Sequence, residues 1–409
     1  MRNSEAAVTP MPRNMGETFV LGDANILSAL PLQRPLPPFS EETLGLLSAL
    51  SQWILQNRGA VLSSELATFA FWCRRAHLEQ MKEESNCADR LGRGVSLHFA
   101  PSNIPLMFAY TMAAGLLTGN CVIVKLPARE VEQERKLLEG IAHLLESGFS
   151  LFTDRIVMLR CPHRKELTDY LSSLCDVRVI WGSNDSVQAI RKSPLPPRAI
   201  ELPFAARSSA AVLLAQTVLE TEELLPLVKA FYNDTYRNDQ NACSSPTVIY
   251  WLGTPETVLR AKVRFWSALE ELLQERQYQI QGSIAVQKLD AALQMAAKYD
   301  HVYIVQMGNQ IVRAEVNALQ CEMWDYIVPG GFFIEADGAS LDALLPILTP
   351  YCQTLCVYGV CADATTEFLL QHRVTGVDRV VPVGHSLDFS LNWDGLSLVG
   401  MMSRRITAS

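Results

Sequence analysis

The chain has 409 residues, of which 49% are hydrophobic and 19% are charged, and its formal net charge at pH 7 is -8. This length exceeds the usual size of a single hydrophobic core, so two domains are expected. An acidic balance without a long Lys or Arg run argues against a nucleic-acid or anionic-membrane surface and favours a small-molecule or protein partner.

Ten cysteines are scattered along the chain, and no CxxC or Cys/His pair has the spacing of a zinc site, so no metal is predicted. The first residues lack the apolar run of a signal peptide, so reduced thiols and a cytoplasmic location are expected. The most apolar stretch, residues 104–117, is shorter than the roughly 20 residues that a membrane span needs. We therefore expect no membrane span.

Residues 1–39 are rich in proline and predict an irregular arm, with one strand near Thr18–Leu21. Ser40 then caps a helix that has acidic residues in its first turn and an apolar stripe along one face. A second helix is predicted over Glu65–Met81. Helices that precede the first long strand indicate an elaborated start to an α/β domain.

From residue 95 onward, strands and helices alternate. Strands are predicted at Val95–Phe99, Cys121–Lys125, Ile156–Leu159 and Val177–Trp181, with helices over 103–117, 130–145 and 163–174 between them. Such βαβ units close in the right-handed sense with parallel strands, so a doubly wound parallel sheet is predicted. A ligand of this sheet would bind at the carboxyl ends of its strands.

No GxGxxG loop follows a predicted strand, so a nucleotide would have to be held in another way. The candidate is the turn Gly182-Ser183, which leads from the Val177–Trp181 strand into a helix and offers free backbone N–H groups to a diphosphate. Ordinary turn chemistry explains a Gly-Ser pair without any ligand, and the pair by itself does not decide between the two.

The second half of the chain predicts another α/β domain with a cysteine at its centre. Strands are predicted at 211–214, 247–251, 301–305 and 354–358, and helices at 220–236, 254–276 and 341–348. Cys243 lies in the polar segment Asn238–Pro246 between a helix and a strand, where loops carry chemistry on a rigid scaffold. It is a candidate nucleophile, although a cysteine beside an apolar strand is also typical of a small buried hydrophobe.

Four segments resemble the aldehyde dehydrogenase superfamily, and they come in the same order. They are Pro101-Ser102-Asn103-Ile104-Pro105, Gly119-Asn120 with the strand that ends at Lys125, Gly182-Ser183, and Gln240-x-x-Cys243. The Ser-Pro pair after Cys243 and the terminal segment from Gly376 to Arg405 narrow this resemblance to the long-chain acyl-CoA reductases, the LuxC-type fatty acid reductases. The resemblance covers residues 90–409.

The resemblance implies an aldehyde-dehydrogenase-like fold and a role for each matched residue. Cys243 corresponds to the catalytic nucleophile and Asn103 to the amide that stabilises the oxyanion. Cofactor contacts are implied for Pro101, Ser102, Lys125 (adenosine ribose) and Gly182-Ser183 (diphosphate). Relatives of this fold usually associate, which implies a homo-oligomer.

Two departures from the superfamily pattern bear on the cofactor and the reaction. Arg129 stands near the position where NAD-dependent members have an acid, and a cation there suits a 2'-phosphate, so NADPH is predicted over NADH. Arg129 as a solvated residue at a helix start is the alternative. The segment Glu201–Ser208 is two residues longer between Glu and Ser than the matching segment of aldehyde-oxidising members, so no base role is carried over to Glu201.

Together these features predict NADPH-dependent reduction of an acyl thioester to an aldehyde through a Cys243 acyl-enzyme. The donor would be an acyl-CoA or an acyl carrier, with a protein that transfers the acyl group as a further partner. The alternatives are a cysteine acyltransferase or thioesterase without hydride transfer, and a non-catalytic scaffold. The predicted domains are 1–205 for nucleotide binding, 206–375 for catalysis, and 376–409 as a C-terminal return or oligomerisation segment.

Overall fold

The structure is a computed structural model, and it describes residue 11 and residues 16–57, 63–104 and 106–408. The chain forms two compact units: unit 1 comprises Met1–Ala205 and Phe389–Ser409, and unit 2 comprises Ala206–Asp388. The C-terminal segment predicted over 376–409 is therefore not one piece. Its first part belongs to unit 2 and its last part to unit 1.

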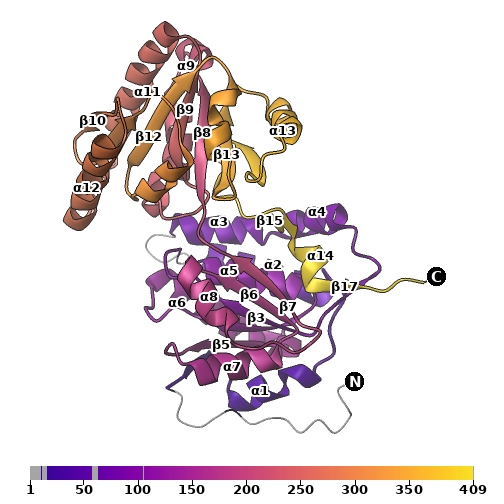
Figure 1. Cartoon of the computed structure of the whole chain (residues 1–409). Coiled ribbons are helices and arrows are strands. Elements are labelled where there is room, and N and C mark those ends of the chain that lie inside the picture. The colour runs from indigo at the N-terminus through magenta and orange to yellow at the C-terminus, as the bar shows by residue number, and fades with distance from the viewer. Residues whose placement is uncertain (1–10, 12–15, 58–62, 105, 409) are drawn as a thin grey trace. The chain divides into compact units, whose positions relative to one another are not determined.

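Unit 1 is built on a six-stranded sheet with the order β1-β5-β4-β3-β6-β7 (Figure 1). The strands are β1 (Thr18–Leu21), β3 (Val95–Phe99), β4 (Cys121–Lys125), β5 (Ile156–Arg160), β6 (Val177–Trp181) and β7 (Ile200–Phe204). All are parallel except β1, which pairs antiparallel with β5. β7 was not predicted from the sequence; it is an edge strand, and it tolerates Pro203 because its outer side has no strand partner in this sheet.

Helices cover both faces of this sheet because successive strand residues point to opposite sides. Val122 and Val124 enter one core, and Cys121 and Ile123 enter the other. The first face carries α2 (Glu41–Gln56), α3 (Ser64–Trp72), α4 (Arg75–Ser85), α5 (Met107–Leu117) and α6 (Glu132–Ser147). The second carries α1 (Ala24–Ala29), α7 (Lys165–Leu174) and α8 (Asn184–Arg191). Of the two short 3-10 helices, η1 (Leu30–Leu32) packs with the second core and η2 (Ser150–Phe152) with the first.

Two of the predicted helices differ from the structure. The single helix expected over Glu65–Met81 is two helices, because Arg74 takes an extended conformation and the His77 ring bonds the Trp72 carbonyl that ends α3 (2.8 Å). The helix expected from residue 103 begins only at Met107, and Pro105 lies outside the described residues. Residues 101–104 are therefore a loop that follows β3.

The last part of the chain is fixed to unit 1 by aromatic packing and a small sheet. Phe389 packs against Trp72, Tyr110 and Trp393, with ring centroids 5.8, 5.1 and 5.3 Å away, and the Trp72 indole N–H donates to the Phe389 carbonyl (3.0 Å). The elements here are β2 (Arg90–Gly92), β15 (Asn392–Trp393), β16 (Leu396–Ser397), α14 (Leu398–Met402) and β17 (Ser403–Arg405). β17 pairs antiparallel with β2, which joins the chain's end to the strand before β3.

Unit 2 is built on a seven-stranded sheet with the order β10-β11-β12-β9-β8-β13-β14, in which only β10 is antiparallel to its neighbour (Figure 1). The strands are β8 (Ser208–Leu214), β9 (Pro246–Leu252), β10 (Tyr303–Met307), β11 (Ile311–Glu315), β12 (Phe332–Gly338), β13 (Cys352–Tyr358) and β14 (Arg379–Pro382). Because β14 pairs with β13, residues 379–382 belong to this sheet.

The two faces of the unit 2 sheet are also covered by helices. One face carries α9 (Ala215–Glu220), α10 (Leu225–Asp234), η3 (Tyr236–Asn238) and α11 (Pro255–Glu275). The other carries α12 (Gly282–Lys298), η4 (Cys321–Tyr326), η5 (Leu341–Ile347) and α13 (Ala362–Gln371). Among all the helices of the described ranges, none is long and apolar enough to cross a membrane.

Candidate active site

Cys243 lies in a turn that directly precedes β9, at the edge of the unit 2 sheet where the parallel strands begin. The side chain is half-buried, and its Sγ accepts an N–H from Nε2 of Gln353 at 3.3 Å. Gln353 is fully buried at the start of β13. A fixed N–H donor beside a sulfur stabilises the thiolate relative to the thiol, which is the form that acts as a nucleophile.

The Cys243 turn is tied to two neighbouring strands through one serine. The Ser209 hydroxyl donates to the Cys243 carbonyl (2.8 Å) and accepts the backbone N–H of Thr354 (3.1 Å). Ser209 is fully buried in β8, so these bonds are shielded from competing water. The main chain at Cys243 is thereby held at a fixed place where the parallel strands begin.

Gln240 holds the other side of the same turn. Asp239 and Gln240 have φ angles of 49° and 57°, a left-handed conformation that costs roughly 1–2 kcal/mol per non-glycine residue. The Gln240 side chain is 4% exposed; its Oε1 accepts the Gly331 N–H (2.9 Å) and its Nε2 donates to the Pro246 carbonyl (2.9 Å). These bonds offset the strain and fix the path of the chain into β9.

Other cysteines of the chain differ from Cys243 in their burial and in the pKa of their thiols. Burial raises the pKa of Cys121 to about 11 and that of Cys352 to about 12, so both stay protonated and unreactive near neutral pH. Cys321 and Cys361 are exposed. Cys243 combines partial exposure with an amide donor, which supports the nucleophile interpretation over simple packing.

The predicted cofactor residues of unit 1 gather at the carboxyl ends of three adjacent strands. In the register, Phe99 at the end of β3 lies opposite Lys125 of β4 and Ile180 of β6. The loop 101–104 follows β3, and the Gly182-Ser183 turn follows β6. Because the strand order turns back between β3 and β6, a ligand of this sheet is expected to bind next to these residues.

The predicted cofactor residues differ in their burial and hydrogen bonds. Lys125 is 9% exposed, and burial lowers the pKa of its ammonium. Ser183 caps α8 by accepting the Ser186 N–H (3.3 Å), and a Cβ at Gly182 would lie 3.2 Å from Cβ of Ser186. Ser102 and Asn103 are exposed on the loop after β3. The start of α8 is therefore an open turn in which glycine avoids a tight contact.

Arg129 and Glu201, the two residues that depart from the superfamily pattern, have different surroundings. Arg129 is exposed in the loop after β4, and the same loop is fixed by Arg160, which donates to the Pro127 carbonyl (3.3 Å). Glu201 is paired with Arg178 and, at 2.7 Å, with Nε of Arg191. This double pairing gives Glu201 a structural role in unit 1.

Gln353 and Ser209 are the site residues that sequence reasoning missed. Gln353 is 110 positions away from Cys243 along the chain, and only the pairing of the strands brings the two together. The available signal was a polar residue at the start of an apolar strand. A buried glutamine in such a strand requires hydrogen-bond partners, and the Cys243 sulfur is one of them.

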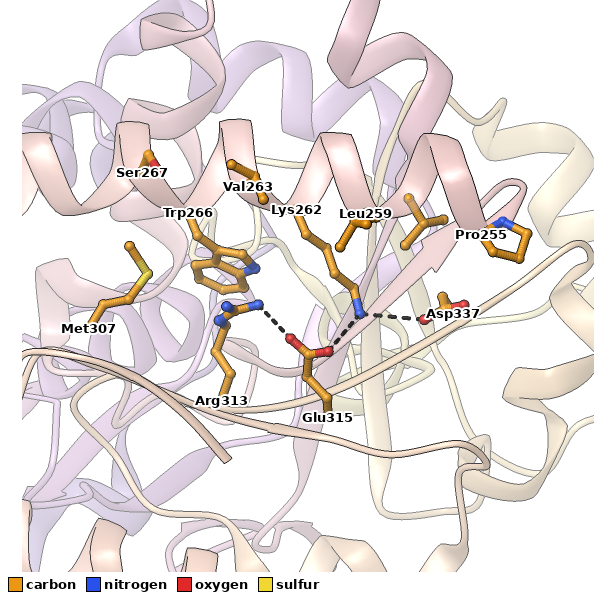
Figure 2. A pocket seen from close by; sticks show the side chains of 11 residues that line it. Pro255, Leu259, Lys262, Val263, Trp266, Ser267, Met307, Arg313, Glu315 and Asp337 are labelled. Atoms are coloured by element: carbon orange, nitrogen blue, oxygen red, sulfur yellow. Dashed lines mark hydrogen bonds and ion pairs between the residues drawn. The ribbon is translucent and has the colours of Figure 1, made fainter. Parts of the chain in front are cut away.

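Unit 2 also contains a cavity of about 440 Å³ beside α11 (Figure 2). Figure 2 shows a chain of alternating charges in it, in which Glu315 bonds both Arg313 (3.0 Å) and Lys262 (3.5 Å), and Lys262 also bonds Asp337 (3.4 Å). These charges pair with one another, and Arg313 also pairs with the buried Glu335 (2.6 Å). In the strand register, Asp337 of β12 lies beside Trp251, near the carboxyl end of β9. Cys243 precedes the amino end of β9, so the cavity lies toward the opposite strand ends. Across the described ranges, no three His, Cys, Asp or Glu side chains are grouped to hold a metal ion.

Residues 32–405 match the family described as acyl-CoA reductase (LuxC). The chain belongs to this family. It is 23% identical over 164 residues to a long-chain acyl-protein thioester reductase of Aliivibrio fischeri, and 28% identical over 170 residues to the protein of that name from Vibrio harveyi. Each alignment covers 39% of this chain and only 32% of the relative's length.

Solved structures establish the fold of this acyl-CoA reductase family member. A 3,6-anhydro-L-galactose dehydrogenase superposes with a TM-score of 0.66 at 13% identity, and the match covers 96% of both chains. Lactaldehyde dehydrogenase from Escherichia coli gives a TM-score of 0.64 at 13% identity, covering 97% of this chain and 96% of that one. The predicted aldehyde dehydrogenase fold, with two α/β units built on largely parallel sheets, is confirmed.

Proposed function

We propose that this protein reduces an acyl thioester to an aldehyde with NADPH, through an acyl-enzyme on Cys243. The observation that carries the proposal is the Cys243 thiol, held in a tied turn with the Gln353 amide 3.3 Å from its sulfur. A thiolate is a strong nucleophile toward carbonyl carbon, and it exchanges one thioester for another. Membership of the acyl-CoA reductase family supports the same class of reaction.

The chemistry assigns one covalent step to the chain itself. The Cys243 sulfur attacks the acyl carbonyl, the donor thiol leaves with a proton, and a Cys243 thioester remains. This carbonyl carbon then accepts the hydride that NADPH supplies, and the resulting thiohemiacetal collapses to aldehyde and free thiol. The backbone N–H of Cys243 and the side-chain amide of Asn103 are the proposed oxyanion donors. Loss of one such donor costs about 10²–10³ in rate.

NADPH is proposed to bind at the carboxyl ends of β3, β4 and β6. The first turn of α8 offers backbone N–H groups to the diphosphate at Gly182-Ser183, a position where the helix dipole also favours negative charge. Lys125 would contact the adenosine ribose, with Pro101-Ser102 forming the adjacent wall. Arg129, exposed on the loop after β4, would pair with the 2'-phosphate. NADH would lack that contact and bind more weakly.

The proposed donor is an acyl group on a protein or on CoA. The curated relatives carry the name acyl-protein thioester reductase, which favours a protein-bound acyl group. The family description names acyl-CoA. Both donors present the same thioester carbonyl to Cys243, and the difference lies in the surface that receives the carrier.

The experiment measures NADPH oxidation with a panel of acyl-CoA and acyl-carrier-protein thioesters, while a hydrazine reagent traps the aldehyde. We expect stoichiometric aldehyde and NADP⁺, both abolished in Cys243→Ala and both retained in the exposed-cysteine control Cys361→Ala. Free acid and thiol without NADPH loss would instead identify a thioesterase or acyltransferase. Equal activity in Cys243→Ala would overturn the proposed role of the thiol.

A further inference from the structure

Lys288 in α12 is a buried lysine that pairs with no carboxylate among the residues that the structure describes. Its side chain is enclosed (0% exposed), and Nζ donates to the main-chain oxygens of Asn309 (2.5 Å) and Gly330 (2.7 Å). Burial lowers the pKa of this ammonium to about 8. Taking an ion out of water without a counter-charge opposes folding, and an apolar side chain would fill a core position without that cost. The charge therefore requires another explanation.

A single peptide group connects Lys288 to the loop that carries the nucleophile. The Gly330 carbonyl and the Gly331 N–H belong to the same peptide bond, so one group accepts from Lys288 (2.7 Å) and donates to Oε1 of Gln240 (2.9 Å). A cation on the carbonyl oxygen polarises the peptide and makes its N–H a stronger donor. Gln240 in turn donates to the carbonyl of Pro246, three residues after Cys243 (2.9 Å).

The surroundings leave this peptide little freedom to move. Gly331 has a φ of +90°, and a Cβ there would lie 2.0 Å from the Gln310 carbonyl and 2.6 Å from the Tyr236 hydroxyl. On the other side, the Gly330 N–H donates to the Asp239 carbonyl (2.9 Å). Lys288 therefore acts on a tightly enclosed peptide that bonds Gln240, while the peptide before it bonds Asp239. Both bonded residues are the consecutive left-handed residues of the turn before Cys243.

We propose that Lys288 is a positioning residue for Cys243, and that it acts through the Gly330–Gly331 peptide and the Gln240 side chain. The inference rests on the proposed role of Cys243 as the nucleophile. Lys288 has no part in bond making. Its ammonium strengthens the bond that fixes Gln240, and Gln240 fixes the direction from which the Cys243 turn enters β9.

The test measures the alkylation rate of individual cysteines by iodoacetamide across a pH series, with each site quantified by peptide mass spectrometry. In Lys288→Met, we expect the Cys243 rate at neutral pH to fall about tenfold, because small displacements of a reacting atom are costly. The exposed Cys321 and Cys361 of the same molecule should react at wild-type rates. The matched control is Lys298→Met, an exposed lysine on the same helix, which should leave all three rates unchanged.

A double-mutant cycle distinguishes this route from a general loss of packing. If Gln240 carries the effect, Lys288→Met should change Cys243 reactivity far less in a Gln240→Met background than in the wild-type chain. Independent effects that multiply would overturn the proposal, as would a wild-type Cys243 rate in Lys288→Met. Should that variant fail to fold, Lys288→Gln keeps an uncharged amide donor toward the carbonyls, and it must show a smaller fall in the same direction.

This experiment separates the inference from the proposed function. Alkylation needs neither an acyl donor nor a nucleotide, so a Lys288 effect on Cys243 remains measurable if no aldehyde is ever formed. Reductase activity that survives in Cys243→Ala would refute the function and leave the alkylation result standing. In an active enzyme, Lys288→Met should lower kcat while the KM for NADPH stays unchanged.

Discussion

The two sheets present their proposed functional residues at opposite strand ends and in different environments. In unit 1, the cofactor residues follow the carboxyl ends of β3, β4 and β6, where Ser102, Asn103 and Ser183 are exposed. In unit 2, Cys243 precedes the amino end of β9, and its turn is fixed by the buried side chains of Ser209, Gln240 and Gln353.

This difference follows from what each region is proposed to do. A nucleotide is bound by several weak contacts from loops and a helix start, which can remain solvated until the ligand arrives. A nucleophile must place one sulfur atom within a few tenths of an ångström, and that accuracy requires buried, fully satisfied hydrogen bonds. Substitutions in the buried network should therefore change the rate of acyl transfer, and substitutions in unit 1 should change nucleotide affinity.

The largest expected effect comes from replacing the nucleophile itself. Cys243→Ser keeps the size of the side chain but replaces a thiolate-forming group with a weakly acidic hydroxyl, so acyl-enzyme formation should fall by roughly 10³ or more. Rapid-quench measurement of the covalent intermediate tests this, with Cys321→Ser as the control on an exposed thiol. Comparable acylation of the serine variant would contradict the assignment.

The buried ammonium of Lys288 should make stability depend on pH. Its pKa is lowered from 10.5 to about 8 in the folded chain, so between these values the unfolded chain holds a proton that the folded chain has released. The contribution of Lys288 to the free energy of unfolding therefore rises with pH across that window, by about 3 kcal/mol in total. Below pH 8 the cost of burying the charge is constant.

The free energy of unfolding is measured by urea titration for the wild type and for Lys288→Met, from pH 7 to pH 10.5. The difference between the two proteins at each pH gives the contribution of Lys288. Burial also raises the pKa of Tyr236 and Tyr278 near the same turn, and Asp239 bonds the Tyr278 hydroxyl (2.8 Å). These groups are common to both chains, so they cancel in the difference. A difference that does not vary with pH would show that Lys288 titrates as a solvated lysine.

Gln353→Leu should lower the rate of acyl transfer without changing nucleotide affinity. Leucine fills the buried site but removes the N–H that points at the Cys243 sulfur, so we expect acyl transfer to fall by about 10–10². The apparent pKa of the Cys243 thiol, read from the pH dependence of alkylation, should rise because the thiolate loses a donor. The dissociation constant of NADPH, measured by fluorescence titration, should stay at its wild-type value.

The central strands of unit 1 were predictable from sequence, but its edge strand β7 and the surroundings of Cys243 were not. β3, β4 and β6 are short apolar runs bounded by turn residues, and their predicted limits are the observed ones. α12 escaped prediction because Val286 and Leu293 are exposed while Ala292 and Met295 are buried, so apolar residues lie on both of its sides. Ser209 and Gln353, which bond Cys243, come from β8 and β13. Local sequence patterns cannot predict such contacts, because they form only when distant strands pair.

The site residues also divide into those that the sequence predicted and those that only the folded chain reveals. The order of the four family-like segments gave candidate residues that lie together at the strand ends of unit 1 and at the start of β9 in unit 2. Their roles in binding and catalysis stay predictions. Gln353 and Lys288 each sit in a stretch whose local sequence is that of an ordinary strand or helix, and only the hydrogen bonds of the folded chain reveal them.

The smallest expected effect concerns the choice of nucleotide. Arg129→Ala removes an exposed cation from the loop after β4, and the KM for NADPH should rise about fivefold, as expected for one solvated pair with a phosphate group. The KM for NADH should not change, because NADH has no 2'-phosphate. Initial rates with both cofactors give the ratio, and Arg135→Ala, on the exposed face of α6, is the matched control. Equal shifts for both nucleotides would mean that Arg129 supports the loop and does not read the 2'-phosphate, and the preference would then have to arise elsewhere at the strand ends of unit 1.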